Sequence, residues 1–163
     1  STSLVTAGFL TALYSLTSSL LRVVGGFVSD KLGGEKVVLV SFVLVAVGAI
    51  LMMLTTDSFA IAVSGQMVLA LGMGFANAAV FKLVPKFSPK SVGGAAGVVG
   101  GLGAFGGFVI PPLMGFFVKA LGVSGYAWGY SVFVMLALVS LVVFMFLNRS
   151  APSKLRTPMP GKD

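Results

Sequence analysis

Five long apolar segments joined by short loops constrain this chain of 163 residues more than any other feature. They cover about residues 4–28, 37–54, 59–83, 92–118 and 126–147. A helix rises about 1.5 Å per residue and a bilayer core is about 30 Å thick, so about 20 apolar residues suffice to span it. The sequence therefore predicts an all-α membrane protein whose five transmembrane helices form one bundle over residues 1–148.

The composition narrows the chemistry that this chain can perform. Hydrophobic residues make up 57% of the sequence and charged residues only 9%, against about 25% charged residues in soluble domains. There is no cysteine and no histidine, so disulfides, thiolate chemistry and the commonest metal ligand are all excluded. We expect neither an enzyme nor a cofactor or metal site.

The basic residues predict how the chain sits in the membrane. Nine of them fall in the loops after the first and third segments or in the polar tail, residues 149–163: Lys31, Lys36, Lys82, Lys86, Lys90, Arg149, Lys154, Arg156 and Lys162. Only Lys119 falls on the opposite side. Because cytoplasmic loops carry an excess of Lys and Arg, we expect a disordered cytoplasmic tail on a multi-pass protein of the cell (inner) membrane. This distribution explains the net charge of +7 better than nucleic-acid binding does.

The start of the sequence suggests a part of a longer polypeptide. Ser1 leads into an apolar segment within three residues, without an initiator methionine or the basic region of a signal peptide. With five crossings and a cytoplasmic tail, Ser1 lies outside the cell. We therefore expect a missing N-terminal portion that reaches residue 1 after at least one further crossing.

Arg22 is a charge deep in the first segment. It precedes Asp30, at the cytoplasmic boundary, by eight residues, or about 12 Å of helix, which places it near the middle of the bilayer. An uncompensated charge there costs about 3 kcal/mol or more, and no acidic residue of the sequence lies at that depth. Arg22 either snorkels to the headgroups or faces an internal cavity and binds an anion, and the depth favours the anion.

Two other features are expected at the depth of Arg22. Asn77 precedes Pro85, the expected end of the third helix, by eight residues, and Gly100 follows Val92 by eight. Three helices would thus bring a guanidinium, an amide and bare backbone to one level. The alternative for Asn77 is an interhelical hydrogen bond, worth about 1 kcal/mol.

The fourth segment contains an unusual concentration of glycine: eight of residues 93–107, with no charge between Lys90 and Lys119. A segment that spans lipid must stay helical, and glycine then permits close approach of another group. Either these glycines only pack helices, or the helix both packs and lines a narrow pathway. We expect Gly97 and Gly100 to face a substrate, and a packing role for Gly93, Gly101, Gly103, Gly106 and Gly107. Pro111 and Pro112 should kink the outer end.

Three stretches resemble known motifs in the same order and spacing. Residues 26–33, Gly-Phe-Val-Ser-Asp-Lys-Leu-Gly, resemble the signature that the major facilitator superfamily carries after its second and eighth helices. Residues 97–108, Gly-Val-Val-Gly-Gly-Leu-Gly-Ala-Phe-Gly-Gly-Phe, resemble the glycine-rich signature of its nitrate/nitrite porter family, and residues 77–85 resemble the tenth helix of that family. The resemblance covers nearly the whole chain up to the tail. It implies a partial C-terminal bundle, helices eight to twelve, of a twelve-helix transporter.

The resemblance also implies roles for individual residues. Arg22 matches the substrate arginine of the eighth helix, while the family's second arginine, on the second helix, would lie outside this chain. Gly97 and Gly100 match the small residues that approach the bound anion. The loop motif, and with it the cytoplasmic gate, comprises Gly26, Asp30, Lys31 and Gly33. The chain departs from close relatives of the family at Ala78, where they tend to have glycine, and Gly34-Glu35 replaces the usual basic pair.

The implied function is secondary active transport of nitrate and/or nitrite by alternating access, with the missing N-terminal half and the lipid bilayer as partners. A guanidinium can meet two oxygens of such an anion at once. Because this portion has no acid or histidine at membrane depth, nitrate/nitrite exchange is favoured over proton-coupled nitrate uptake. The alternatives are a facilitator for another small anion and a truncated membrane protein that does not transport.

Overall fold

The computed structural model describes residues 4–54 and 58–150, and of Ser150 only the backbone. Those residues form six helices: α1 Leu4–Leu32, α2 Gly34–Met53, α3 Phe59–Phe87, α4 Val92–Leu121, α5 Ser124–Gly129 and α6 Ser131–Ser150. Five helical stretches are long and apolar enough to cross a membrane, with α5 and most of α6 forming one of them. The prediction of an all-α membrane protein with five spans is confirmed. Arg149 and Ser150 extend α6, and residues 151–163 of the predicted tail lie outside the described residues.

The prediction that the third helix ends before Pro85 is wrong. Pro85 lies inside α3, which continues to Phe87, and the Ser88 amide donates to the Val84 carbonyl at 2.8 Å. Proline removes only its own N–H and disturbs the carbonyl four residues earlier, so this close to the end only the last turn is affected. Helix α4 likewise continues through Pro111 and Pro112, and the kink expected there stays a prediction.

The last span is divided at Tyr130, which the sequence did not predict. The Tyr130 amide donates to the Ala127 carbonyl at 3.1 Å, so the chain tightens between α5 and α6. Gly125 and Gly129 are both buried against α4: a Cβ on Gly125 would lie 2.2 Å from the Phe117 carbonyl oxygen. The short helix α5 is therefore held against α4 by contacts that only glycine permits.

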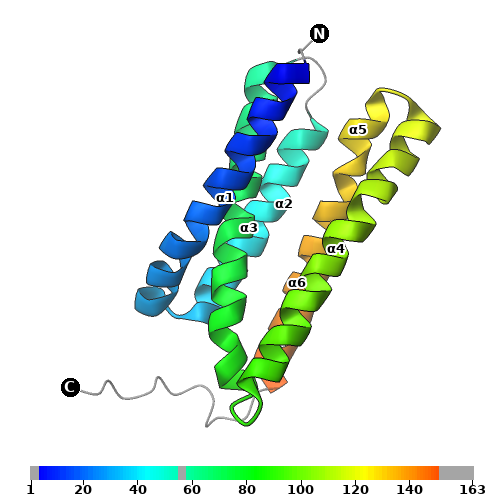
Figure 1. Cartoon of the computed structure of the whole chain (residues 1–163). Coiled ribbons are helices and arrows are strands. Elements are labelled where there is room, and N and C mark those ends of the chain that lie inside the picture. The colour runs from blue at the N-terminus through cyan, green and yellow to red at the C-terminus, as the bar shows by residue number, and fades with distance from the viewer. Residues whose placement is uncertain (1–3, 55–57, 151–163) are drawn as a thin grey trace.

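The helices form two groups, which Figure 1 shows on either side of a gap. In the first group α3 packs on both α1 and α2. In the second group α4 packs on α5, which leads directly into α6, and α6 also packs against α2. Helices α3 and α4 converge at the end where one leads into the other and diverge towards the opposite end (Figure 1).

Glycines bring α2 and α3 unusually close together. A Cβ on Gly48 would lie 2.6 Å from the Leu69 amide nitrogen, and one on Gly72 would lie 2.7 Å from the Val45 amide nitrogen. Such distances leave no room for any side chain, so the two backbones are in direct contact. Next to this contact lies the core cluster of Val37, Val38, Ala79 and Leu83, with Val28, Phe42, Phe75, Val80 and Phe144 packed against it.

Candidate substrate-binding site

Arg22 and Asn77 lie at nearly the same level of the bundle, on the neighbouring helices α1 and α3. A Cβ on Gly74 would lie 2.8 Å from Leu21, and one on Gly25 would lie 3.0 Å from the Cα of Phe75. These contacts show that α1 and α3 run parallel, and they fix their relative height. Arg22 comes directly after Leu21 in α1, and Asn77 comes two residues after Phe75 in α3. Along the bundle axis, the two side chains therefore start within about one helical turn, about 5 Å, of each other.

The polar groups of Arg22 and Asn77 are free within the described part of the chain. Arg22 is exposed on α1 and Asn77 is half-buried on α3. Neither side chain makes a hydrogen bond or ion pair with any residue of 4–54 or 58–150. A guanidinium and an amide at one level, both without a protein partner in these ranges, are suited to bind an anion.

The two glycines expected at the substrate differ in their surroundings. A Cβ on Gly100 would lie 3.7 Å from the Phe81 ring, which α3 carries one turn after Asn77, whereas one on Gly97 would meet nothing within 4 Å. The Phe81 ring of α3 thus lies next to the backbone of α4 at Gly100. In the described part of the chain α4 does not pack against α1, so neither glycine is brought to Arg22.

Five other glycines of α4 have open space around them. A Cβ would meet nothing within 4 Å at any of the five positions expected to pack: Gly93, Gly101, Gly103, Gly106 and Gly107. Their packing role stays a prediction, and it requires a partner from outside the described residues.

The loop motif forms a tight connection between α1 and α2. Gly33 alone separates the two helices and has a φ of 90°, a conformation that other residues rarely adopt. Gly34 is buried beside Leu83 of α3, whose side chain would lie 3.0 Å from an added Cβ. Gly26 is partly buried, and Lys31 is exposed in the last turn of α1.

Two ion pairs tie this connection to α3. Lys82 Nζ donates to Asp30 Oδ1, and Lys86 Nζ donates to Glu35 Oε1. The two lysines are one turn apart on α3, and the two acids lie at the end of α1 and the start of α2. Sequence reasoning treated these lysines only as orientation charges. The signal that could have revealed the pairs is the spacing of four between Lys82 and Lys86, opposite the spacing of five between Asp30 and Glu35.

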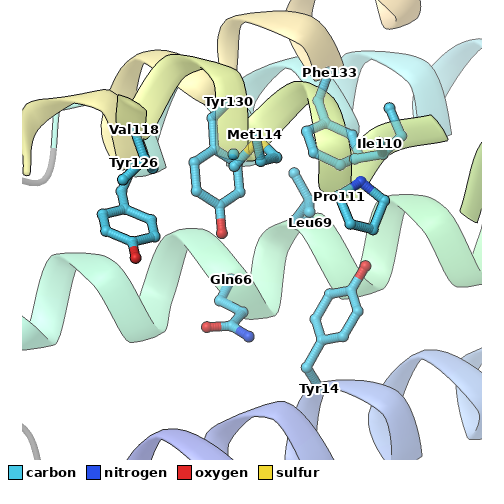
Figure 2. A pocket seen from close by; sticks show the side chains of 11 residues that line it. Tyr14, Gln66, Leu69, Ile110, Pro111, Met114, Val118, Tyr126, Tyr130 and Phe133 are labelled. Carbon is cyan, nitrogen blue, oxygen red and sulfur yellow. The ribbon is translucent and has the colours of Figure 1, made fainter. Parts of the chain in front are cut away.

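A largely apolar cavity of about 560 Å³, lined also by Tyr14, Gln66 and Tyr130, was not predicted. It lies between α1 and α3 on one side and α4, α5 and the start of α6 on the other. Figure 2 shows Tyr14, Tyr130 and Gln66 among the residues that line it, with the Tyr130 hydroxyl pointing towards α3. The Tyr14 hydroxyl donates to the Met73 sulfur at 2.9 Å. The sequence contained a signal for this cavity, because a glutamine and a tyrosine lie inside the predicted spans.

Comparisons with known proteins identify relatives of this chain. The chain is 31% identical over 160 residues to a probable nitrate/nitrite antiporter, NarK1, of Thermus thermophilus, covering 87% of this chain and 35% of that protein. It is 32% identical over 151 residues to a probable nitrate transporter, NarT, of Staphylococcus carnosus (strain TM300), covering 92% of this chain and 39% of the relative. The NarT of Staphylococcus haemolyticus (strain JCSC1435) is 30% identical over 144 residues, covering 88% and 36%.

The chain thus spans little more than a third of the length of these relatives. No solved structure matches it. The family model of the Major Facilitator Superfamily matches residues 1–162. Five helices long and apolar enough to span a membrane, the loop motif with its positive-φ glycine and an arginine inside α1 accompany that match. This chain belongs to the major facilitator superfamily.

Proposed function

We propose that this chain forms part of a secondary transporter that carries nitrate or nitrite across the cell membrane by alternating access. The observation that carries the proposal is the position of Arg22, inside a transmembrane helix and away from both its ends, level with Asn77 and without a hydrogen-bond or ion-pair partner among residues 4–54 and 58–150. The relatives, a probable nitrate/nitrite antiporter and two probable nitrate transporters, supply the substrate class.

The charge of Arg22 explains why the substrate is an anion. A guanidinium near the bilayer centre costs about 3 kcal/mol or more unless it is paired or hydrated. Asp30 and Glu35, the acids of the described residues, lie at the ends of α1 and α2 and are bound to Lys82 and Lys86. A bound nitrate or nitrite compensates the charge, and its oxygens accept two parallel hydrogen bonds from the planar guanidinium.

The orientation follows from the basic residues at the two ends of the bundle. Helices α1, α3 and α6 end where α2 and α4 begin, and this end carries Lys31, Lys36, Lys82, Lys86, Lys90 and Arg149. The opposite end carries Lys119. Because positively charged loops stay inside the cell, the C-terminus lies in the cytoplasm and the residues before α1 lie outside.

The described residues contain no acidic or histidine side chain that could relay protons at the level of Arg22, which favours anion exchange. The chain contains no histidine, and within the described ranges no aspartate or glutamate lies at the level of Arg22. An empty Arg22 site would leave its charge uncompensated during the return step, whereas a second anion removes that cost. We therefore favour nitrate/nitrite antiport over proton-coupled uptake.

Counterflow in proteoliposomes tests this function on the native polypeptide that carries residues 1–163. We expect internal nitrite to accelerate uptake of labelled nitrate several-fold, and an imposed proton gradient to change it little. Strong inhibition by formate or larger carboxylates would instead indicate a carrier for another anion. These 163 residues alone should show no saturable nitrate uptake, because they lack the residues that complete the site.

A further inference from the structure

Glycines lie in the middle of the contact between α1 and α3, at the level of Arg22. Gly74 of α3 is buried, and an added Cβ there would lie 2.8 Å from the Ser18 carbonyl oxygen. Gly25 of α1 is buried in the same way against the Cα of Phe75. Glycine brings two backbones close together, but it offers no side-chain ridge that interlocks with the facing helix. These contacts therefore set the distance between α1 and α3 more firmly than they oppose sliding of one helix along the other.

Directional side-chain contacts tie α1 to α3 on both sides of these glycines. Towards the outer end, Tyr14 extends from α1 towards α3 (Figure 2), and its hydroxyl donates to the Met73 sulfur at 2.9 Å. Both of these side chains are half-buried. Towards the cytoplasmic end, Lys82 pairs with Asp30, whose side chain is 69% exposed. Water screens an exposed ion pair, whereas breaking a hydrogen bond at membrane depth leaves the hydroxyl poorly solvated. The Tyr14–Met73 bond is therefore the stronger restraint on the relative height of the two helices.

Short lengths of helix connect both members of this bond to the candidate anion site. Tyr14 precedes Arg22 by eight residues, or about 12 Å along α1. Met73 precedes Asn77 by four residues, so their side chains lie on the same face of α3, one turn apart. Sliding of α1 along α3 by the rise of a single residue, about 1.5 Å, would move Arg22 by the same amount relative to Asn77. Hydrogen bonds from two donors to one small anion weaken steeply with such a displacement.

We propose that Tyr14 is a positioning residue of the anion site: through its hydrogen bond to Met73 it holds α1 at the height on α3 at which Arg22 and Asn77 bind one anion together. This role rests on the proposed function, because it concerns the same site. Tyr14 does not touch the anion, since it lies about two turns from Arg22. The bond acts by keeping the binding-competent height populated, and the apparent affinity of a site falls in proportion to that population.

A double-mutant cycle on nitrate uptake tests this role in proteoliposomes that hold the native polypeptide carrying residues 1–163. Tyr14→Phe removes the hydroxyl and keeps the ring, and Met73→Leu removes the acceptor and keeps an apolar side chain of similar size. We expect each variant to raise the KM for nitrate about threefold, the factor that corresponds to a typical hydrogen bond between membrane helices, and to change Vmax by less than about twofold. The double variant should have the KM of either single variant, because both substitutions break the same bond.

Tyr126→Phe is the matched control for the loss of a hydroxyl. Tyr126 lines the same cavity as Tyr14, but it is 62% exposed and lies on α5, which packs on α4. Its variant should keep the KM of the parent protein, and a rise equal to that of Tyr14→Phe would contradict a specific role of the Tyr14–Met73 bond. A purely structural role of Tyr14 would also contradict the proposal, and it would lower thermal stability and Vmax while leaving the KM unchanged.

A second cycle shows whether Tyr14 acts through the anion site. In an Asn77→Ala background Arg22 has no amide to stand level with, so Tyr14→Phe should no longer raise the KM. An undiminished rise in that background would overturn the positioning role and leave the proposed function intact, and so would an unchanged KM in Tyr14→Phe protein whose parent transports nitrate. If the parent protein shows no saturable nitrate uptake, the proposed function fails and the positioning role fails with it.

Discussion

The glycines of the α2–α3 contact and those of α4 have the same chemistry and opposite surroundings. At Gly48 and Gly72 an added Cβ would lie within 2.7 Å of the opposing backbone, whereas at Gly101 and Gly103 it would meet nothing within 4 Å. The first set completes a contact inside the chain. The second set belongs to a helix without buried residues. Glycine density thus identifies a helix that can be approached closely, but not what approaches it.

The largest effect of a substitution on stability is expected at the α2–α3 contact. Gly72→Ala places a methyl group 2.7 Å from the Val45 amide nitrogen and 3.0 Å from the Ser41 carbonyl oxygen. Because backbone atoms of a packed helix cannot move aside cheaply, we expect a loss of about 3 kcal/mol in the free energy of unfolding. Thermal unfolding of the detergent-solubilised protein measures it. A variant as stable as the parent would show that the α2–α3 contact is looser than described.

A smaller effect is expected where the loop motif is fixed to α3. Glu35 is 26% exposed and Lys86 31% exposed in their pair, whereas Asp30 in the pair with Lys82 is 69% exposed. Lys86→Ala should therefore destabilise by about 1 kcal/mol and Lys82→Ala by about 0.3 kcal/mol, since exposed pairs are screened by water. Unfolding of both variants at low and high salt measures the difference. Equal losses of stability in the two variants would show that burial does not make one ion pair stronger than the other.

The smallest effect of a substitution on stability is expected in α4. Gly103→Ala adds a methyl group to open space and improves helix propensity, so the 163-residue chain should change in stability by less than about 1 kcal/mol, and in the stabilising direction. In the native polypeptide the same variant should lower nitrate uptake if another helix approaches there. Equal uptake by parent and variant would indicate that Gly103 stays open in the assembled transporter.

The sequence predicted the parts of the fold that depend on composition along one segment. Five spans follow from hydropathy, because lipid requires helical backbone whatever the neighbours are. The break at Tyr130 was missed, because it depends on contacts of Gly125 and Gly129 with α4 that no local pattern shows. The extension of α3 past Pro85 was missed because a proline near the end of a helix disturbs only its last turn.

Of the candidate site, the relative height of two residues was predictable, whereas their role in binding stays a prediction. Counting residues from the cytoplasmic boundary placed Arg22 and Asn77 at one depth, and the contacts of Gly25 and Gly74 give the same result independently. The ion pairs of Lys82 and Lys86 were missed because pairing depends on how α1 and α2 lie against α3. Counting depths also could not show that α4 stands apart from α1, since a shared level says nothing of lateral distance.

The most direct test of the account replaces Arg22 by lysine in the native polypeptide and measures saturable nitrate uptake in proteoliposomes. Lysine keeps the charge but loses the planar pair of donors. We predict a fall in uptake of about tenfold or more, with unchanged thermal stability, because Arg22 makes no hydrogen bond or ion pair with the described residues that lysine would break. Uptake at the level of the parent protein would contradict a guanidinium–anion site at Arg22.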